Sequence, residues 1–76
     1  MSRIKSVVPR ENFKLEVDMD NGSIVILDFK NRLNTIRFGM LSEEEYFKRA
    51  ATDGKCIRWD KEIEISASEV FQLAQK

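Results

Sequence analysis

Few residues of this 76-residue chain have the types and spacing that chemistry needs. There is no histidine, which is the commonest general base and the commonest metal ligand in proteins. The one cysteine, Cys56, could act as a nucleophile, because the cation of Arg58 two positions later would favour its thiolate. We favour a second interpretation, in which Cys56 is a small apolar residue of a strand. The residues thus predict no catalytic, cofactor-binding or metal-binding site, and no enzyme.

Two acidic groups have both a chemical and a structural interpretation. Asp18, Asp20 and Asp28 could supply oxygen ligands to a divalent cation, or they could belong to the solvated face of a hairpin. The three glutamates at 43–45 could be an acidic docking patch, or the first turn of a helix, where the positive end of the helix dipole favours carboxylates. We favour the structural interpretation of both groups.

The charge balance narrows the class of partner. Lys plus Arg and Asp plus Glu each number 13, so the net charge is zero. This balance argues against a strongly electrostatic partner, and we expect neither nucleic acid nor an anionic membrane. The nearest approach to a basic surface comes from Arg3, Lys5, Arg10, Lys30, Arg32 and Arg37, which we interpret as ordinary solvated charge.

The length of the chain predicts a single domain over residues 1–76. A domain of this size buries a small core and is marginally stable alone, so pairing with another chain would stabilise it. No apolar run approaches the roughly 18 residues that a membrane-spanning helix needs. The N-terminus lacks the apolar core of a signal peptide, and one cysteine is typical of a reducing compartment. We therefore predict a cytoplasmic protein.

Residues 13–29 hold the clearest structural signal. Polar and apolar residues alternate over 13–20, and an apolar run follows over 23–29. Asn21-Gly22 between them is the strongest short-range signal of a β-hairpin, because a tight turn needs residues that tolerate a positive φ. The run from Ile24 to Leu27 is apolar on both faces, which predicts a central strand or a strand with one face against another subunit.

The register of this hairpin has two solutions. A two-residue loop at Asn21-Gly22 would place Val17 opposite Ile26 and has the better turn chemistry. A three-residue loop with Gly22 in the left-handed region would place Val17 opposite Val25 and gives the better apolar matching. We favour the two-residue loop.

Three further strands are predicted. Residues 3–8 form a first strand, which ends at Pro9 because proline cannot donate to a ladder. Residues 55–59 and 62–65 form a second hairpin around Asp60-Lys61.

Two helices are predicted from their start signals. Ser42 and Ser66 are each followed three positions later by a glutamate, Glu45 and Glu69, which is the pattern of a capping box. The first helix should run to about residue 51. The predicted fold class is α+β, with a small antiparallel sheet from two β-hairpins plus a first strand, two helices, and the order β-β-β-α-β-β-α.

Candidate residues for contact with a partner lie on the apolar strand and at the tryptophan. They are Val25, Leu27, Phe29 and Trp59. Trp59 has two interpretations, a binding hot spot or a core residue that closes the sheet against a helix, and the second is the commoner role of such a tryptophan.

The order of these motifs resembles the small bacterial domain-of-unknown-function family 2442. The resemblance lies in Val8-Pro9, the strand over 15–20, Asn21-Gly22, the strand over 24–28, Ile57-Arg58-Trp59 and Glu64-Ile65-Ser66. The chain differs from the family at residues 60–62 and at Ala67, where members often have Pro-Asn-Gly and proline. The resemblance implies an α+β domain with no established catalytic residues. Some members precede a helix-turn-helix domain, which we expect to be absent here, and others are encoded beside a partner in pairs that resemble toxin–antitoxin modules.

The favoured function is a non-enzymatic protein-interaction module, antitoxin-like or regulatory, which binds a protein partner or a second copy of itself. It follows from the missing catalytic chemistry, the balanced charge and the two-sided apolar strand. One alternative is a regulatory domain that senses a small molecule near Trp59 or Phe38. Another is a weak nucleic-acid binder that uses the cations of the first strand and of the loop after Phe29.

Overall fold

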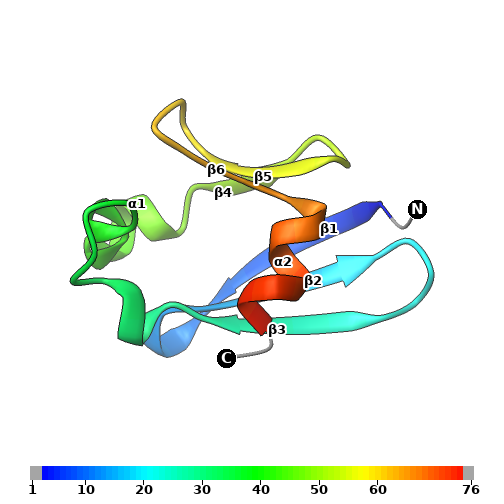
Figure 1. Cartoon of the computed structure of the whole chain (residues 1–76), viewed down its shortest axis with the longest axis horizontal. Helices are drawn as coiled ribbons and strands as arrows, with labels where there is room; N and C mark the ends of the chain where they lie inside the picture. The colour runs from blue at the N-terminus through cyan, green and yellow to red at the C-terminus, as the bar shows by residue number, and fades with distance from the viewer. Residues whose placement is uncertain (1–2, 75–76) are drawn as a thin grey trace.

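In the computed structural model, which describes residues 3–74, two antiparallel sheets of three strands each face one another, and two helices accompany them (Figure 1). The strands and helices are β1 (Ile4–Arg10), β2 (Lys14–Met19), β3 (Ile24–Asp28), α1 (Glu44–Phe47), β4 (Ala50–Thr52), β5 (Cys56–Trp59), β6 (Ile63–Ser66) and α2 (Ala67–Ala74). Short 3-10 turns lie at Glu11–Phe13, Lys30–Arg32 and Gly39–Ser42. The predicted α+β class is confirmed.

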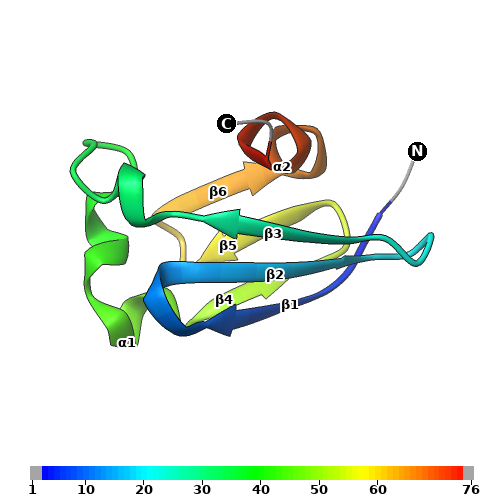
Figure 2. The same ribbon diagram turned by 90° about the horizontal axis from the view of Figure 1, so that it is seen from below.

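The two sheets have the strand orders β1-β2-β3 and β4-β5-β6. They meet on one side where β1 lies beside β4, and the N–H of Ile4 donates to the C=O of Gly54 at 2.9 Å. On the other side α2 packs against β3 and β6, and α1 lies at one end of the sheets (Figures 1 and 2). The space between the sheets is thus closed by protein along both sides.

Apolar side chains from both sheets fill this space. The alternation along β2 sends Leu15, Val17 and Met19 inward, and each of them is almost fully buried. The core consists of Ile4, Leu15, Val17, Met19, Leu27, Phe29, Phe38, Leu41, Phe47, Ile57, Trp59, Ile63, Ile65 and Val70. Since none of the described polar or charged residues is buried, the fold rests on hydrophobic packing.

The favoured register of the first hairpin is wrong. Val17 lies opposite Val25 and not opposite Ile26, so the three-residue alternative is the one that forms. The N–H of Met19 donates to the C=O of Ser23 at 2.8 Å, and Gly22 has a φ of 91°. A one-residue slip would exchange the two faces of β3, so burial of the better apolar set outweighs the preferred turn chemistry.

The ends of β1 and β2 also differ from the prediction. β1 continues through Pro9, which lies opposite Leu15, because an edge strand tolerates a residue that cannot donate on its outer side. β2 begins at Lys14, since Phe13 has a φ of 60° and belongs to the preceding turn. That backbone conformation is rare for a bulky residue. Packing holds it, because the Phe13 ring meets the Phe47 ring edge-on at 5.6 Å.

The first predicted helix is much shorter than expected, and the chain forms a strand in its place. α1 spans only Glu44–Phe47, and the predicted cap is absent because the hydroxyl of Ser42 donates to the C=O of Gly39. Residues 50–52 form β4, which pairs with β5 through Ala50 opposite Trp59. Tertiary pairing with β5 overrides the helical preference of these alanines. The order is therefore β-β-β-α-β-β-β-α.

The second helix begins where it was predicted, with half of the capping box. The N–H of Glu69 donates to the hydroxyl of Ser66 at 3.2 Å. The carboxylate of Glu69 does not return the bond, because it pairs with Arg37. Val70 anchors the helix in the core with no exposed surface.

Candidate interaction surface

The candidate residues Leu27, Phe29 and Trp59 lie in the core. All three are at most 2% exposed. Trp59 donates its indole N–H to the C=O of Phe47 at 3.0 Å, and its ring meets the ring of Phe29 edge-on at 5.6 Å. The core interpretation of Trp59 is confirmed. Val25, the fourth candidate, is a half-buried residue of β3 that packs against the core.

The proposed ligand position near Trp59 or Phe38 is filled with protein. Phe38 is 5% exposed, and its ring meets that of Phe29 at 5.4 Å. Tyr46 closes the other side of the tryptophan, because its hydroxyl donates to the C=O of Trp59 at 2.8 Å. Hydrogen bonds and aromatic contacts thus occupy the surroundings of both residues.

Cys56 is held in a state that opposes nucleophilic chemistry. Burial raises the pKa of its thiol above the ordinary value, and the carboxylates of Glu64 and Asp53 act in the same direction. Arg58 acts in the opposite direction, but its guanidinium is bound to those two carboxylates, at 3.0 Å from Asp53 and 2.9 Å from Glu64. The cation that could have activated the thiol is therefore neutralised by its neighbours.

The acidic groups are spread over turns and strand faces. Asp28 accepts the N–H of Lys30, and Asp18 accepts the hydroxyl of Ser6 at 3.1 Å. Glu44 and Glu45 form the first turn of α1, as the structural interpretation predicted. Within residues 3–74, no three carboxylate, thiol or imidazole side chains come together as ligands for a metal ion.

Most arginines of the described chain are in contact with carboxylates. Ion pairs join Arg10 to Glu16, Arg37 to Glu69, Arg49 to Asp60, and Arg58 to Asp53 and Glu64. Arg32 instead binds two backbone carbonyl groups, those of Asp28 and Leu73. The cations that the sequence suggested as a basic surface thus come from several elements, and two of them are paired within the chain.

The Arg37–Glu69 pair predicts a loss of stability in acid. The hydrogen bonds from Arg37, one of them 2.8 Å long, hold the pKa of Glu69 below its ordinary value. A lowered folded-state pKa contributes stability above the unfolded value, about 4.3, and this contribution disappears as the pH falls through the folded pKa. Because the Arg37 side chain is half exposed, the pair contributes about 0.5 kcal/mol at most.

We expect Glu69→Gln to lower the free energy of unfolding at pH 7 and to have a smaller effect at pH 3, measured by urea denaturation. Glu62→Gln is the control, since Glu62 is an exposed carboxylate for which no ion pair occurs among the described residues. An equal effect of Glu69→Gln at both pH values would show that the charge of Glu69 contributes nothing.

The exposed apolar side chains define a candidate surface on β3. Ile24 is 62% exposed and Ile26 is 50% exposed, and both point to the outer face of the first sheet. β3 is therefore not the central strand that was predicted, since it lies at the edge of its sheet. Ile24 and Ile26 form the solvent-exposed face of the run that the sequence showed to be apolar on both faces. We call Ile24, Ile26 and the backbone between them the β3 edge.

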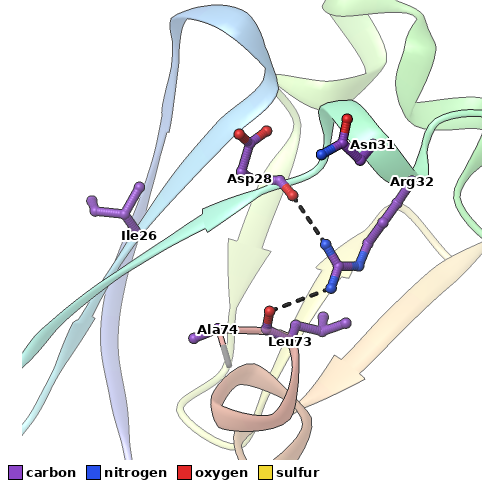
Figure 3. Close-up of a pocket in the computed structure, with 6 residues that line it drawn as sticks. All are labelled: Ile26, Asp28, Asn31, Arg32, Leu73 and Ala74. Carbon is purple, nitrogen blue, oxygen red and sulfur yellow. Dashed lines mark hydrogen bonds between the residues drawn. The ribbon is translucent and has the colours of Figure 1, made fainter. Parts of the chain in front are cut away.

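A hollow of about 370 Å³ lies beside the β3 edge. It is bounded by Ile26 and Asp28 on β3, by Arg32, and by Leu73 and Ala74 at the end of α2 (Figure 3). The guanidinium of Arg32 spans it, with one nitrogen 3.2 Å from the C=O of Asp28 and another 3.3 Å from the C=O of Leu73. The side chain of Ile26 points away from Leu73 and Ala74 (Figure 3). α2 thus leaves space along this part of β3.

The comparisons with known proteins identify the fold. No family model matches the chain, and a search of curated protein sequences also finds no match. Among solved structures, the chain is similar to the crystal structure of a protein from Nitrosomonas europaea described as a "Putative DNA Binding Protein". The TM-score is 0.80 at 18% sequence identity, over 97% of this chain and 49% of the other. The chain therefore spans about half the length of that protein.

This likeness corrects our expectation about nucleic acid. We expected it not to be a partner because the net charge is zero, but a protein that contains this fold is described as a "Putative DNA Binding Protein". Net charge describes one domain, whereas the electrostatic attraction to DNA depends on all the charge of the assembled protein. A balanced charge over 76 residues is thus too narrow a basis for that exclusion.

The described part of the chain contains no helix that is long and apolar enough to cross a membrane.

Proposed function

We propose that this chain is a non-enzymatic interaction module that works within a DNA-binding protein or complex and supplies protein–protein contacts there. One observation carries the proposal: the fold matches about half of the protein described as a "Putative DNA Binding Protein", at a TM-score of 0.80. Fold alone does not imply function, so the surface of this chain must also suit the role.

The surface supports an interaction role in two ways. Ile24 and Ile26 expose apolar area on the outer face of β3, where a partner could bury it. The polar groups that chemistry would need are engaged elsewhere, since Arg58 is bound to Asp53 and Glu64 and the thiol of Cys56 has a raised pKa. An interaction surface therefore accounts for the exposed side chains better than a reaction centre does.

The resemblance to family 2442 supports the same role. Members that precede a helix-turn-helix domain and members encoded beside a partner both place this kind of domain next to another functional unit. An antitoxin-like role, in which the chain binds the product of an adjacent gene, is the form of the proposal that the second arrangement favours.

The proposal is tested by expressing the chain together with the products of its adjacent genes and measuring retardation of duplex DNA from the promoter of that gene group. We expect a complex that contains this chain to retard DNA at about 50 mM salt, and to do so at least about tenfold more weakly at about 200 mM salt, because counterions are released on binding. The control is the same gene products without this chain. The proposal is wrong if neither the chain nor any complex that contains it retards DNA.

A further inference from the structure

The edge strands of the two sheets differ in how they are protected against pairing with a strand of another chain. β1 carries Lys5 and Pro9 and has a register irregularity between Ile4 and Ser6. Charges, prolines and bulges are the usual means by which an edge strand avoids pairing with another chain. β1 is further covered, since it lies beside β4.

The second sheet is protected by other means. β4 has only three residues, and short edge strands offer few groups to pair with. On β6, the C=O of Glu64 accepts a hydrogen bond from Arg37 at 3.0 Å. β3 differs from these strands, because it carries no charge or proline from Ile24 to Leu27. The helix α2 packs against β3, but it leaves a hollow beside Ile26.

The register of the hairpin shows which groups of β3 are free. The N–H of Phe29 donates to Phe13 and the N–H of Met19 donates to Ser23, so hydrogen-bonded pairs recur at every second residue between these positions. Val25 and Leu27 therefore bond to β2. The N–H and C=O groups of Ile24 and Ile26 point away from β2, along the open edge.

We propose that the chain forms a two-fold dimer in which β3 pairs antiparallel with β3 of a second copy, joining the two first sheets into one sheet of six strands. The two-fold axis passes beside Val25. Ile24 then lies opposite Ile26 of the second copy, and Ile26 lies opposite Ile24 of the second copy. This inference names the partner of the interaction module and rests on that proposed function.

The second copy fits this edge because the pairing is complementary to itself. The free N–H and C=O groups of Ile24 meet those of Ile26 in the second copy, so the backbone groups of the β3 edge gain partners. On the outer face, the exposed isoleucines become cross-strand neighbours, which is a favourable aliphatic pair.

The charges near β3 agree with this register. Asp28 of one copy lies opposite Gly22 of the second, so the two Asp28 carboxylates are separated by about 20 Å along the strands. Arg32 already binds the C=O of Asp28 and so ends the pairing there. The hollow beside Ile26 lies at this end of β3, between the strand and the end of α2. Half-buried Val25, one of the residues predicted to bind a partner, comes to the axis.

Sedimentation equilibrium tests the proposal, over chain concentrations from about 1 μM to about 1 mM under reducing conditions. We expect a monomer–dimer equilibrium. Ile26→Pro removes an N–H that β2 does not use, so the intramolecular ladder is kept while the edge is blocked. Ile26→Lys places a charge on the edge strand and provides the same test if the proline variant does not fold. Each variant should weaken dimerisation at least about tenfold.

Ile36→Lys is the matched control, because Ile36 is fully exposed and lies outside β3. It should change the dimerisation constant by less than about twofold. A monomer at every concentration overturns the proposal, as does a dimer that Ile26→Pro and Ile26→Lys leave intact. Assembly beyond the dimer also overturns it, since a two-fold pairing of β3 closes on itself.

A disulfide tests the register. In a Cys56→Ser background, Val25→Cys brings two thiols together at the axis, in a pair of strand positions with Cα atoms about 4.5 Å apart, which a disulfide can span. We expect an intermolecular disulfide in air, and none for Asp28→Cys. The opposite pattern overturns the register. DNA retardation by a complex that contains a strictly monomeric chain would leave the proposed function in place while the dimer fails.

Discussion

Replacing Trp59 with alanine is expected to remove a large part of the stability of this protein. The side chain has no exposed surface and contacts the rings of Phe29 and Phe47. Truncation of a buried aromatic residue to alanine costs about 3–5 kcal/mol. A chain of 76 residues has a total free energy of unfolding of about 4–11 kcal/mol. Urea denaturation followed by far-ultraviolet circular dichroism measures the change.

Trp59→Phe is the control for this prediction, since it keeps one aromatic ring in the core while it removes the indole N–H and the volume of the second ring. The C=O of Phe47 then loses its donor inside the core, which costs about 1–3 kcal/mol. We expect the phenylalanine variant to fold and to lie between the wild type and Trp59→Ala. If Trp59→Ala is as stable as the wild type, Trp59 is not the centre of the core.

Two neighbouring residues of β3 should respond very differently to alanine. Leu27 is 2% exposed and Ile26 is 50% exposed, because successive side chains of a strand point to opposite faces. Leu27→Ala should lower the free energy of unfolding by about 2–5 kcal/mol. Ile26→Ala should change it by about 0.5 kcal/mol or less in the monomer.

This pair of variants also tests the hairpin register, since the two-residue loop would turn Ile26 inward and Leu27 outward. A larger effect at Ile26 would therefore contradict the observed register. The free energy of unfolding is best measured at two chain concentrations about tenfold apart, because dimerisation would add a contribution to the stability that depends on concentration.

The sequence was most informative where a pattern is local. The hairpin over residues 13–29, apart from its register and its first residue, the strand at Ile57-Arg58-Trp59 and the helix start at Ser66 appear where they were predicted. In each case the signal depends on residues close together in the chain: an Asn-Gly turn, an alternation of burial, or a side chain that caps the next turn.

The sequence was least informative where two distant segments decide the outcome. Ala50 and Ala51 have a high helix propensity, but they pair with Trp59 and Arg58 and become a strand. Pro9 was expected to end a strand, but it lies inside one because β1 is an edge strand. Neither strand can be recognised from its own residues, because each pairing depends on a segment elsewhere in the chain.

The candidate surface shows the same division. The sequence showed that the run from Ile24 to Leu27 is apolar on both faces, and it indicated Val25 as a candidate residue for contact with a partner. The sequence did not show which face of β3 is buried, since this depends on whether a loop of two or three residues connects β2 to β3. That choice sends Leu27 into the core and Ile24 and Ile26 outward.

Composition and local spacing alone established an α+β chain that begins with a β-hairpin, has a capped final helix and lacks histidine. These features depend on one residue or on neighbours in the chain. Tertiary packing decided the register, the extra strand β4 and the buried face of β3, because each depends on which segments meet across the core. It also left β3 at an open edge, and no local pattern of residues specifies which strand will lie there.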